Sequence, residues 1–138
     1  MIILDTNVLS ELMRPTPAGK VVRWISARPA SGFYTTSITE SEILLGIRLL
    51  PAGKRREAYE AAALALLSEA FAGRVIPFGS DAASCYATIA AERQGRGQPI
   101  SHFDAQIAAI AKSADATVAT RNVADFEDCG IRVVDPWN

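Results

Sequence analysis

Short apolar segments alternate along this chain with longer stretches whose apolar positions have helical spacing. Apolar or β-branched runs of strand length occur at residues 1–4, 33–36, 74–78, 117–120 and 131–134. Between them, apolar residues recur every three or four positions. This alternation predicts an α/β fold in which a parallel sheet is covered by helices on both faces.

Signals at the helix ends support this pattern. Pro17 suits the first position of one helix. Ser37 and Glu40 have the form of a capping box that opens another, and Gly73 suits the end of a third. Together with the apolar spacing they predict helices over residues 17–28, 38–50, 54–72, 80–95 and 101–114.

The helix over 38–50 carries an acidic residue one turn inside its start. Ile38, Leu45 and Leu49 stand at helical spacing from Glu42 and form an apolar stripe. The pattern therefore predicts that Glu42 points toward the core side of its helix.

Composition indicates one domain over residues 1–138, because this length with 49% hydrophobic residues is enough for a single core. A net charge of −1 gives no global attraction to nucleic acid or to an anionic membrane. Cys85 and Cys129 match no metal or disulfide pattern, which favours reduced thiols and a cytoplasmic protein. No stretch approaches the ~18 apolar residues of a membrane span, and no leader is evident at the start.

Four acidic residues are expected at one edge of the sheet. Asp5 ends the first strand, and Asp125 follows the fourth. Glu42 and Asp104 each lie in the first turns of a helix that starts at that same edge. Because ligands bind at the carboxyl ends of parallel strands, the topology predicts that these carboxylates converge.

Carboxylates brought together raise one another's pKa, so a cation is expected among them. Oxygen ligands suit Mg²⁺, with Mn²⁺ as a possible substitute. Zinc is disfavoured because His102 is the single histidine and the cysteines lack a ligand pattern. The expected metal ligands and catalytic residues are thus Asp5, Glu42, Asp104 and, less securely, Asp125.

Polar neighbours of these acids are candidates for orienting the carboxylates or bound waters, and they are Thr6, Asn7, Ser37, Thr120 and Asn122. Short polar residues at strand ends also cap helices and turns for local reasons. Candidate contacts for phosphate groups are Arg14, Arg48, Arg93, Arg96 and Arg121. The run Lys54-Arg55-Arg56 reads by default as a solvated charged surface.

Each acid also has a purely structural interpretation. Asp104 completes a capping box with Ser101. Glu42 can pair with an arginine such as Arg48, Asp125 can cap a turn, and Asp5 can form an Asx-turn. The last interpretation is the weakest, since an Asp at the end of a buried strand gains little from it.

Four segments stand in a recognisable order along the chain: Ile3 to Val8, Ser37 to Glu42 with Gly46, Asp104 to Ala109, and Ala119 to Asn122 with Asp125-Phe126. In this order they resemble the PIN-domain ribonucleases, in particular the VapC/FitB-like branch of type II toxin–antitoxin toxins. The resemblance extends over essentially the whole chain.

The resemblance implies a Mg²⁺-dependent endoribonuclease with a three-layer sandwich and a five-stranded, mostly parallel sheet. Asp5, Glu42 and Asp104 then correspond to the core acids and Asp125 to a more variable fourth. Ser101-His102-Phe103 departs from the smaller residues expected before Asp104, which puts the local substrate contacts in doubt.

The resemblance also implies partners: an RNA substrate, a second copy of the chain in a homodimer, and a small cognate antitoxin. Such an antitoxin inhibits the toxin and is the route by which the complex binds DNA. The helices expected over 17–28 and 54–72 are candidate interface elements.

Two other functions fit parts of the pattern. A noncatalytic PIN-like module would bind a partner or RNA, although such a module has no need of four acids. An aspartyl-phosphate enzyme would use Asp5 as its nucleophile. Residue 7 is Asn, however, where the haloacid-dehalogenase-like phosphatases have a second Asp.

Overall fold

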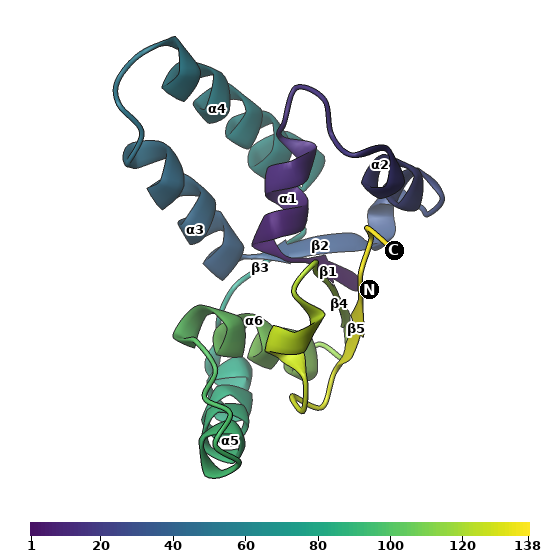
Figure 1. Ribbon diagram of the computed structural model, residues 1–138, viewed down its shortest axis with the longest axis vertical. Helices are drawn as coiled ribbons and strands as arrows, with labels where there is room; N and C mark the ends of the chain where they lie inside the picture. Colours follow the sequence, from purple (N-terminus) through teal and green to yellow (C-terminus); the bar gives the residue numbers. More distant parts are fainter.

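The computed structural model describes all residues from 1 to 138 and has a five-stranded sheet at its centre (Figure 1). All neighbouring strands are parallel, in the order β3-β2-β1-β4-β5, so the predicted parallel sheet is confirmed. The strands are β1 (Ile2–Leu4), β2 (Phe33–Thr36), β3 (Val75–Ile76), β4 (Thr117–Ala119) and β5 (Arg132–Val134).

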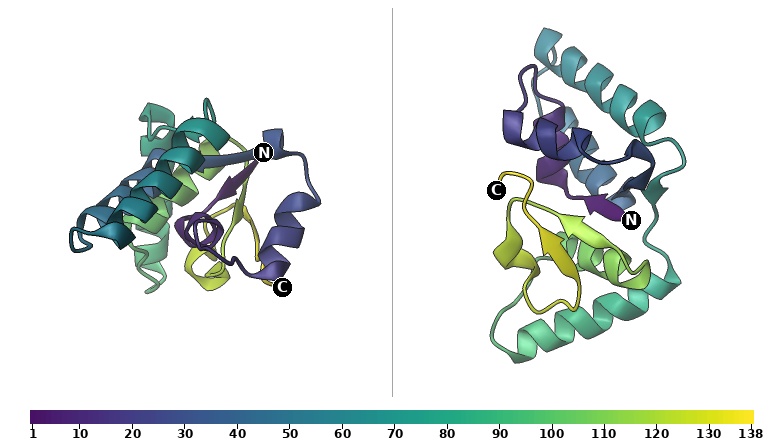
Figure 2. Two further views of the ribbon diagram at one scale, coloured as in Figure 1. Left: turned by 90° about the horizontal axis from the view of Figure 1, so that it is seen from above. Right: turned by 90° about the vertical axis from the view of Figure 1, so that its right-hand side faces the viewer.

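Six α-helices cover the two faces and give three layers (Figures 1 and 2). The first four lie on one side of the sheet and the last two on the other. No helix is long and apolar enough to cross a membrane. The helices are α1 (Thr6–Leu12), α2 (Gly19–Ser26), α3 (Ser37–Arg48), α4 (Lys54–Leu64), α5 (Ser80–Gly95) and α6 (His102–Ser113).

The central strands are buried on both faces, which explains their continuous apolar sequences. Ile3 of β1 and Val118 of β4 pack in one core with residues of α5 and α6. Their neighbours Leu4 and Ala119 pack in a second core with α1, α2, α3 and α4. All four side chains are fully buried, as expected where alternate residues point to opposite faces.

Several helix boundaries differ from the prediction. Helix α1 was not predicted; it begins directly after Asp5, without a turn between strand and helix. Helix α2 begins at Gly19 instead of Pro17. The expected helix over 54–72 changes after Leu64 into a π-helical segment, Ala65–Ala70.

Helix α3 is capped and oriented differently from the prediction. Its N-cap is Thr36, whose hydroxyl accepts a 3.1 Å bond from the Thr39 N–H, so the capping box at Ser37 was wrong. The buried face carries Ile43 and Ile47, whereas Leu45 and Leu49 of the predicted stripe are 54% and 75% exposed. The helix is apolar on two sides, and periodicity alone selected the wrong one.

Candidate active site

Asp5 lies where β1 passes into α1, and its carboxylate is held on both oxygens. The Thr6 N–H donates to Oδ1 over 2.8 Å, so Asp5 is the N-cap of α1. The Thr120 hydroxyl donates to Oδ2 over 2.8 Å, and the Asn7 amide approaches the same oxygen at 3.3 Å. Asp5 therefore has a capping role, but it is also fixed from a second strand end.

Asn7 and Thr120 join the carboxyl ends of β1 and β4. The Asn7 amide donates to the Thr120 hydroxyl over 3.1 Å, and its carbonyl oxygen accepts from the Arg121 N–H over 3.1 Å. The Asn122 N–H donates to the Thr120 hydroxyl, also over 3.1 Å. This network fixes the backbone on both sides of Asp5.

Glu42 reaches the same region from α3. The Thr6 hydroxyl donates to its Oε1 over 2.9 Å and lies 3.1 Å from the Thr39 hydroxyl. Glu42 forms no ion pair, so the alternative pairing with Arg48 is not what the structure shows. Its side chain is half-buried beside the buried residue Ile43.

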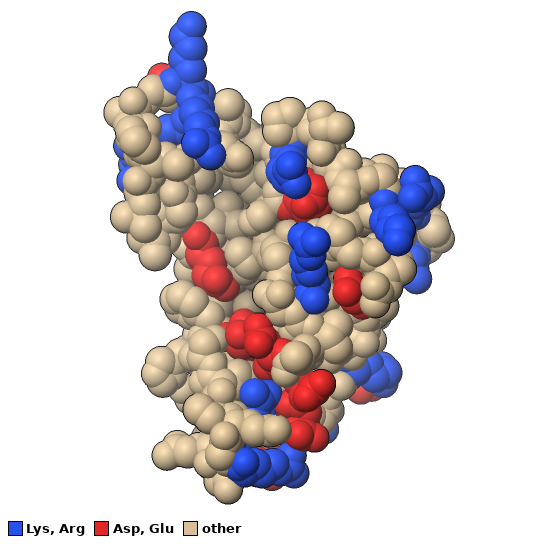
Figure 3. Space-filling model, in the orientation of Figure 1, with Lys and Arg blue, Asp and Glu red and all other residues tan.

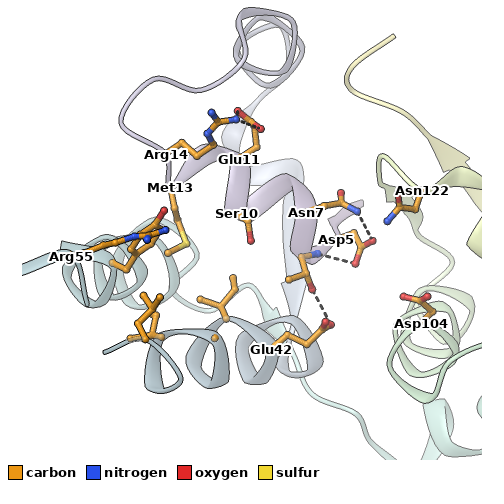
Figure 4. A pocket seen from close by; sticks show the side chains of 16 residues that line it. Asp5, Asn7, Ser10, Glu11, Met13, Arg14, Glu42, Arg55, Asp104 and Asn122 are labelled. Atoms are coloured by element: carbon orange, nitrogen blue, oxygen red, sulfur yellow. Dashed lines mark hydrogen bonds and ion pairs between the residues drawn. The ribbon is translucent and has the colours of Figure 1, made fainter. Parts of the chain in front are cut away.

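Asp104 projects from the first turn of α6, on the opposite side of the sheet edge (Figure 4). Its N–H donates to the hydroxyl of Ser101, the N-cap of that helix, over 3.1 Å. This bond is the Ser101 half of the capping box considered for Asp104. Asp104 also lines the same pocket as Asp5.

Asp5, Glu42 and Asp104 line one pocket of about 680 Å³. Asn122 and Tyr59 also line this pocket. Arg14 and Arg55 line it at the end opposite Asp104 (Figure 4). Acidic side chains gather along the middle of this face, with basic side chains around them (Figure 3). The pocket thus carries Asp5, Glu42 and Asp104 toward one end and the two arginines toward the other (Figure 4).

Three of the four acids that line the pocket have raised pKa values, and the exception is Glu11. Burial is the main cause of the raised pKa at Asp5, Glu42 and Asp104. The charges of neighbouring carboxylates raise each pKa further, while hydroxyl hydrogen bonds from Thr120, Thr6 and Ser101 act in the opposite direction. No lysine or arginine pairs with these acids. These three carboxylates therefore concentrate negative charge that no ion pair neutralises.

The donor set suits a hard divalent cation, because every side-chain ligand available is an oxygen. The acids do not form a closed cage: no group of three or more Asp, Glu, His or Cys side chains is close enough to enclose an ion. Mg²⁺ needs only one or two carboxylates and keeps several waters, so an open arrangement fits it better than it fits zinc.

The remaining predicted site residues lie in different places. Asp125 is exposed on a short 3₁₀ turn, Val123–Phe126, and does not line the pocket, but its charge raises the pKa of Asp5 and of Asp104. Ser37 does not support a carboxylate; its hydroxyl accepts a 3.3 Å bond from the Phe78 N–H.

The basic residues were only partly predicted. Arg14 lines the pocket as expected, and Arg55 does so although it was assigned to a solvated run. Arg93 was a candidate for phosphate contact, but it is buried. Arg96 instead pairs with Asp128 on the surface.

Glu11 was missed, because it lies on the unpredicted helix α1. It is almost fully buried and accepts from the Ala18 N–H over 2.8 Å. This hydrogen bond, followed by the charge of Arg14, holds the pKa of Glu11 below its usual value. Glu11 therefore fixes the α1–α2 connection and presents Arg14 at the pocket.

Comparison with known proteins gives consistent matches. The family model described as PIN domain matches residues 2–130. The VapC ribonuclease Y4jK of Sinorhizobium fredii is 39% identical, with 99% of this chain and 98% of that protein covered. Toxin FitB of Neisseria gonorrhoeae is 38% identical, with 100% and 99% covered.

Solved structures agree. The structure of FitAB bound to the IR36 DNA fragment superposes with a TM-score of 0.91 at 39% identity, covering 100% of this chain and 96% of that one. DNA-bound VapBC from Salmonella typhimurium gives a TM-score of 0.78 at 28% identity, covering 98% and 97%.

Proposed function

The chain belongs to the PIN domain family, among the VapC and FitB toxins of toxin–antitoxin systems, and from this membership we propose that it is a Mg²⁺-dependent endoribonuclease. The observation that carries the proposal is the pocket where Asp5, Glu42 and Asp104 meet without a cationic partner. These carboxylates come from three separate elements, and the fold gives them no shared structural task.

One or two of these carboxylates would bind the ion directly and the others through its waters. The ion would supply an activated water and stabilise the leaving oxygen of a phosphodiester. Thr120 and Thr6 orient the carboxylates of Asp5 and Glu42 through their hydroxyl hydrogen bonds. Asp125 adds negative charge from the β4 side. Asn122, which lines the pocket, would supply a neutral oxygen. Mn²⁺ would serve in place of Mg²⁺, since it prefers the same ligands.

Arg14 and Arg55 would receive the phosphates that flank the scissile bond. Both line the pocket at the end opposite Asp104 (Figure 4). Phosphate contacts from arginines position a nucleic acid without reading its sequence. The chain's net charge of −1 gives no other broad attraction to RNA.

We also propose the partners and location that the family membership suggests. The protein would act as the toxin of a type II pair in the cytoplasm, as a homodimer inhibited by a small cognate antitoxin. DNA would be bound only through that antitoxin. The solved relatives FitAB and VapBC are toxin–antitoxin complexes bound to DNA, which supports this assignment.

Incubating the purified protein with total cellular RNA and Mg²⁺, and mapping the cut ends, tests the activity. We expect defined cuts that disappear on chelation and in Asp5→Asn, and that persist in Asp81→Asn, which changes an exposed acid of α5. Circular dichroism establishes that both variants are folded. Cleavage by folded Asp5→Asn at the wild-type rate would overturn the proposal.

The noncatalytic alternative predicts a different result. A binding module would retain RNA without cutting it and would give no heat on titration with Mn²⁺. Calorimetry with Mn²⁺, followed by an RNA gel-shift measurement, separates the two functions.

A further inference from the structure

Arg93 is a buried cation without a carboxylate partner. It lies in the last turn of α5 and is 7% exposed. None of the ion pairs in the chain involves it. Burying a guanidinium is costly unless its donors are satisfied, so its contacts identify what it stabilises.

The hydrogen bonds of the Arg93 side chain all go to backbone carbonyls and one thiol. Nη1 donates to the carbonyl oxygens of Asp125 over 3.1 Å and of Glu127 over 2.7 Å, and it lies 3.7 Å from Cys129 Sγ. Nε donates to the carbonyl of Gln98 over 2.7 Å, and the Gln98 N–H returns a 2.9 Å bond to the Arg93 carbonyl.

These contacts join the segment before Asp104, which lines the pocket, to the turn that carries Asp125, whose charge raises the pKa of Asp5 and Asp104. Gln98 lies just before Ser101, the cap of the helix that carries Asp104. Asp125 lies on the turn Val123–Phe126, which packs against α6 (Figure 1). One planar fork thus fixes the approach to Asp104 and the backbone of Asp125 together.

We propose that Arg93 is a positioning residue of the metal site, which holds the Asp125 turn and the segment before Asp104 in register. The inference rests on the proposed function, because it assigns the metal to these acids. Arg93 touches no carboxylate of the site, and its hydrogen bonds to these two segments all go to backbone carbonyls. Its charge also lowers the pKa of Asp104, against the effect of burial.

Phe126 offers a competing explanation, since it is almost fully buried in the core with α5 and α6 and also anchors the turn. If Phe126 alone fixed the turn, Arg93 would contribute to stability but not to metal binding. Metal affinity therefore discriminates between the two explanations, whereas thermal stability does not.

The test measures the Kd for Mn²⁺ by calorimetry, without RNA. Arg93→Lys keeps the charge but loses the fork, and we expect it to weaken Mn²⁺ binding about tenfold, as for other residues that support metal ligands. The matched control is Arg96→Met, which removes an exposed arginine from the same end of α5 and its ion pair with Asp128. Its Kd should stay at the wild-type value, because exposed pairs contribute little.

Arg93→Met tests whether loss of the side chain strengthens or weakens metal binding. Removing a cation near the acids favours a bound metal through electrostatics alone, whereas loss of positioning weakens binding. We expect weaker binding. In an Asp125→Asn background, Arg93→Lys should weaken Mn²⁺ binding by a smaller factor than in wild type, because part of the effect of Arg93 on the Kd passes through Asp125.

A wild-type measurement guards against a variant that does not fold. On Mg²⁺ addition, the NMR signals of the Arg93 Nε–H and of the amides from 123 to 129 should shift together with those around Asp5. Wild-type Mn²⁺ binding with an unchanged Kd in Arg93→Lys, or Mg²⁺ shifts that spare Arg93, would overturn this inference alone. No Mn²⁺ binding by the wild type would overturn the proposed function as well.

Discussion

Thr6 has two tasks at the pocket that involve different atoms. Its N–H donates to Asp5 as part of the α1 cap, and its hydroxyl donates to Glu42. One residue therefore links the carboxylate at the end of β1 to the carboxylate of α3. Changing the hydroxyl alone leaves the backbone bond in place, so the two tasks can be separated.

Thr6→Val should weaken metal binding without unfolding the protein. The pKa of Glu42 is raised by burial and lowered by the Thr6 hydroxyl, so loss of that hydroxyl raises it further. We expect Mn²⁺ affinity to fall about tenfold by calorimetry at neutral pH. Thr6→Ser retains a donor and should restore most of the affinity. Equal Kd values for the valine variant and wild type would show that Glu42 does not need this bond.

At the scale of elements, the strands were predictable because burial on two faces gives β1 and β4 unbroken apolar sequences. Helices α5 and α6 were also predicted close to their observed bounds. Convergence of Asp5, Glu42 and Asp104 in one pocket follows from a parallel topology. The contacts of Arg93 were not predictable, since its partners are distant in sequence. Those of Glu11 were not predictable because it lies on α1, a helix that no turn residue precedes.

Helix α1 shows why the boundary between a strand and a helix can be missed in the sequence. Asp5 ends a strand and caps a helix at once, so the usual turn residues between the two elements are absent. Helix α3 shows why the buried face of a helix can be predicted wrongly, because it carries Ile43 and Ile47 on the buried side and Leu45 and Leu49 on the exposed side.

The start of α3 provides a test of the observed cap. Thr36 is fully buried and its hydroxyl accepts from the Thr39 N–H, so Thr36→Ala should destabilise the protein by about 1 to 2 kcal/mol. Ser37→Ala removes only a 3.3 Å bond from the Phe78 N–H and should cost about 1 kcal/mol or less. Urea unfolding measures both, and a larger loss for Ser37→Ala would return the cap to the residue expected from the sequence.

At the scale of the whole molecule, α3 exposes apolar side chains beside the pocket. Leu45 and Leu49 lie one turn apart and are largely exposed. Exposed apolar strips of this kind are typical of contact surfaces. They make α3 a candidate surface for the proposed homodimer, in addition to the α2 and α4 segments expected from the sequence.

The double variant Leu45→Glu/Leu49→Glu should shift the protein from dimer to monomer in sedimentation velocity, with unchanged circular dichroism. The side chains are too exposed for the change to disturb the core. Val22→Glu on α2 is the matched control, since Val22 is 40% exposed on another helix. Dissociation by Val22→Glu instead would place the interface on α2.

The concentration of carboxylates also couples the stability of the whole fold to pH and metal. The pKa values of Asp5, Glu42 and Asp104 are raised above their ordinary values of 3.8, 4.5 and 3.8. Between the ordinary and the raised pKa values, the folded protein therefore binds more protons than the unfolded chain. The free energy of unfolding consequently falls as the pH rises through the raised pKa values. Glu11, with a lowered pKa, acts oppositely and loses its contribution only at lower pH.

Without divalent metal, the Tm should decrease as the pH is raised from about 4 through the raised pKa values. At neutral pH, Mg²⁺ at about 100 times its Kd should add about 2.7 kcal/mol, because it binds only the folded state. For a domain of this size that corresponds to a rise in Tm on the order of 10 °C, measurable by scanning calorimetry. Asp5→Asn should show a shallower pH dependence and no rise with Mg²⁺. If the wild-type Tm neither fell as the pH was raised nor responded to Mg²⁺, the charges of the pocket acids would be compensated by other groups of the protein. These acids would then not form a metal site.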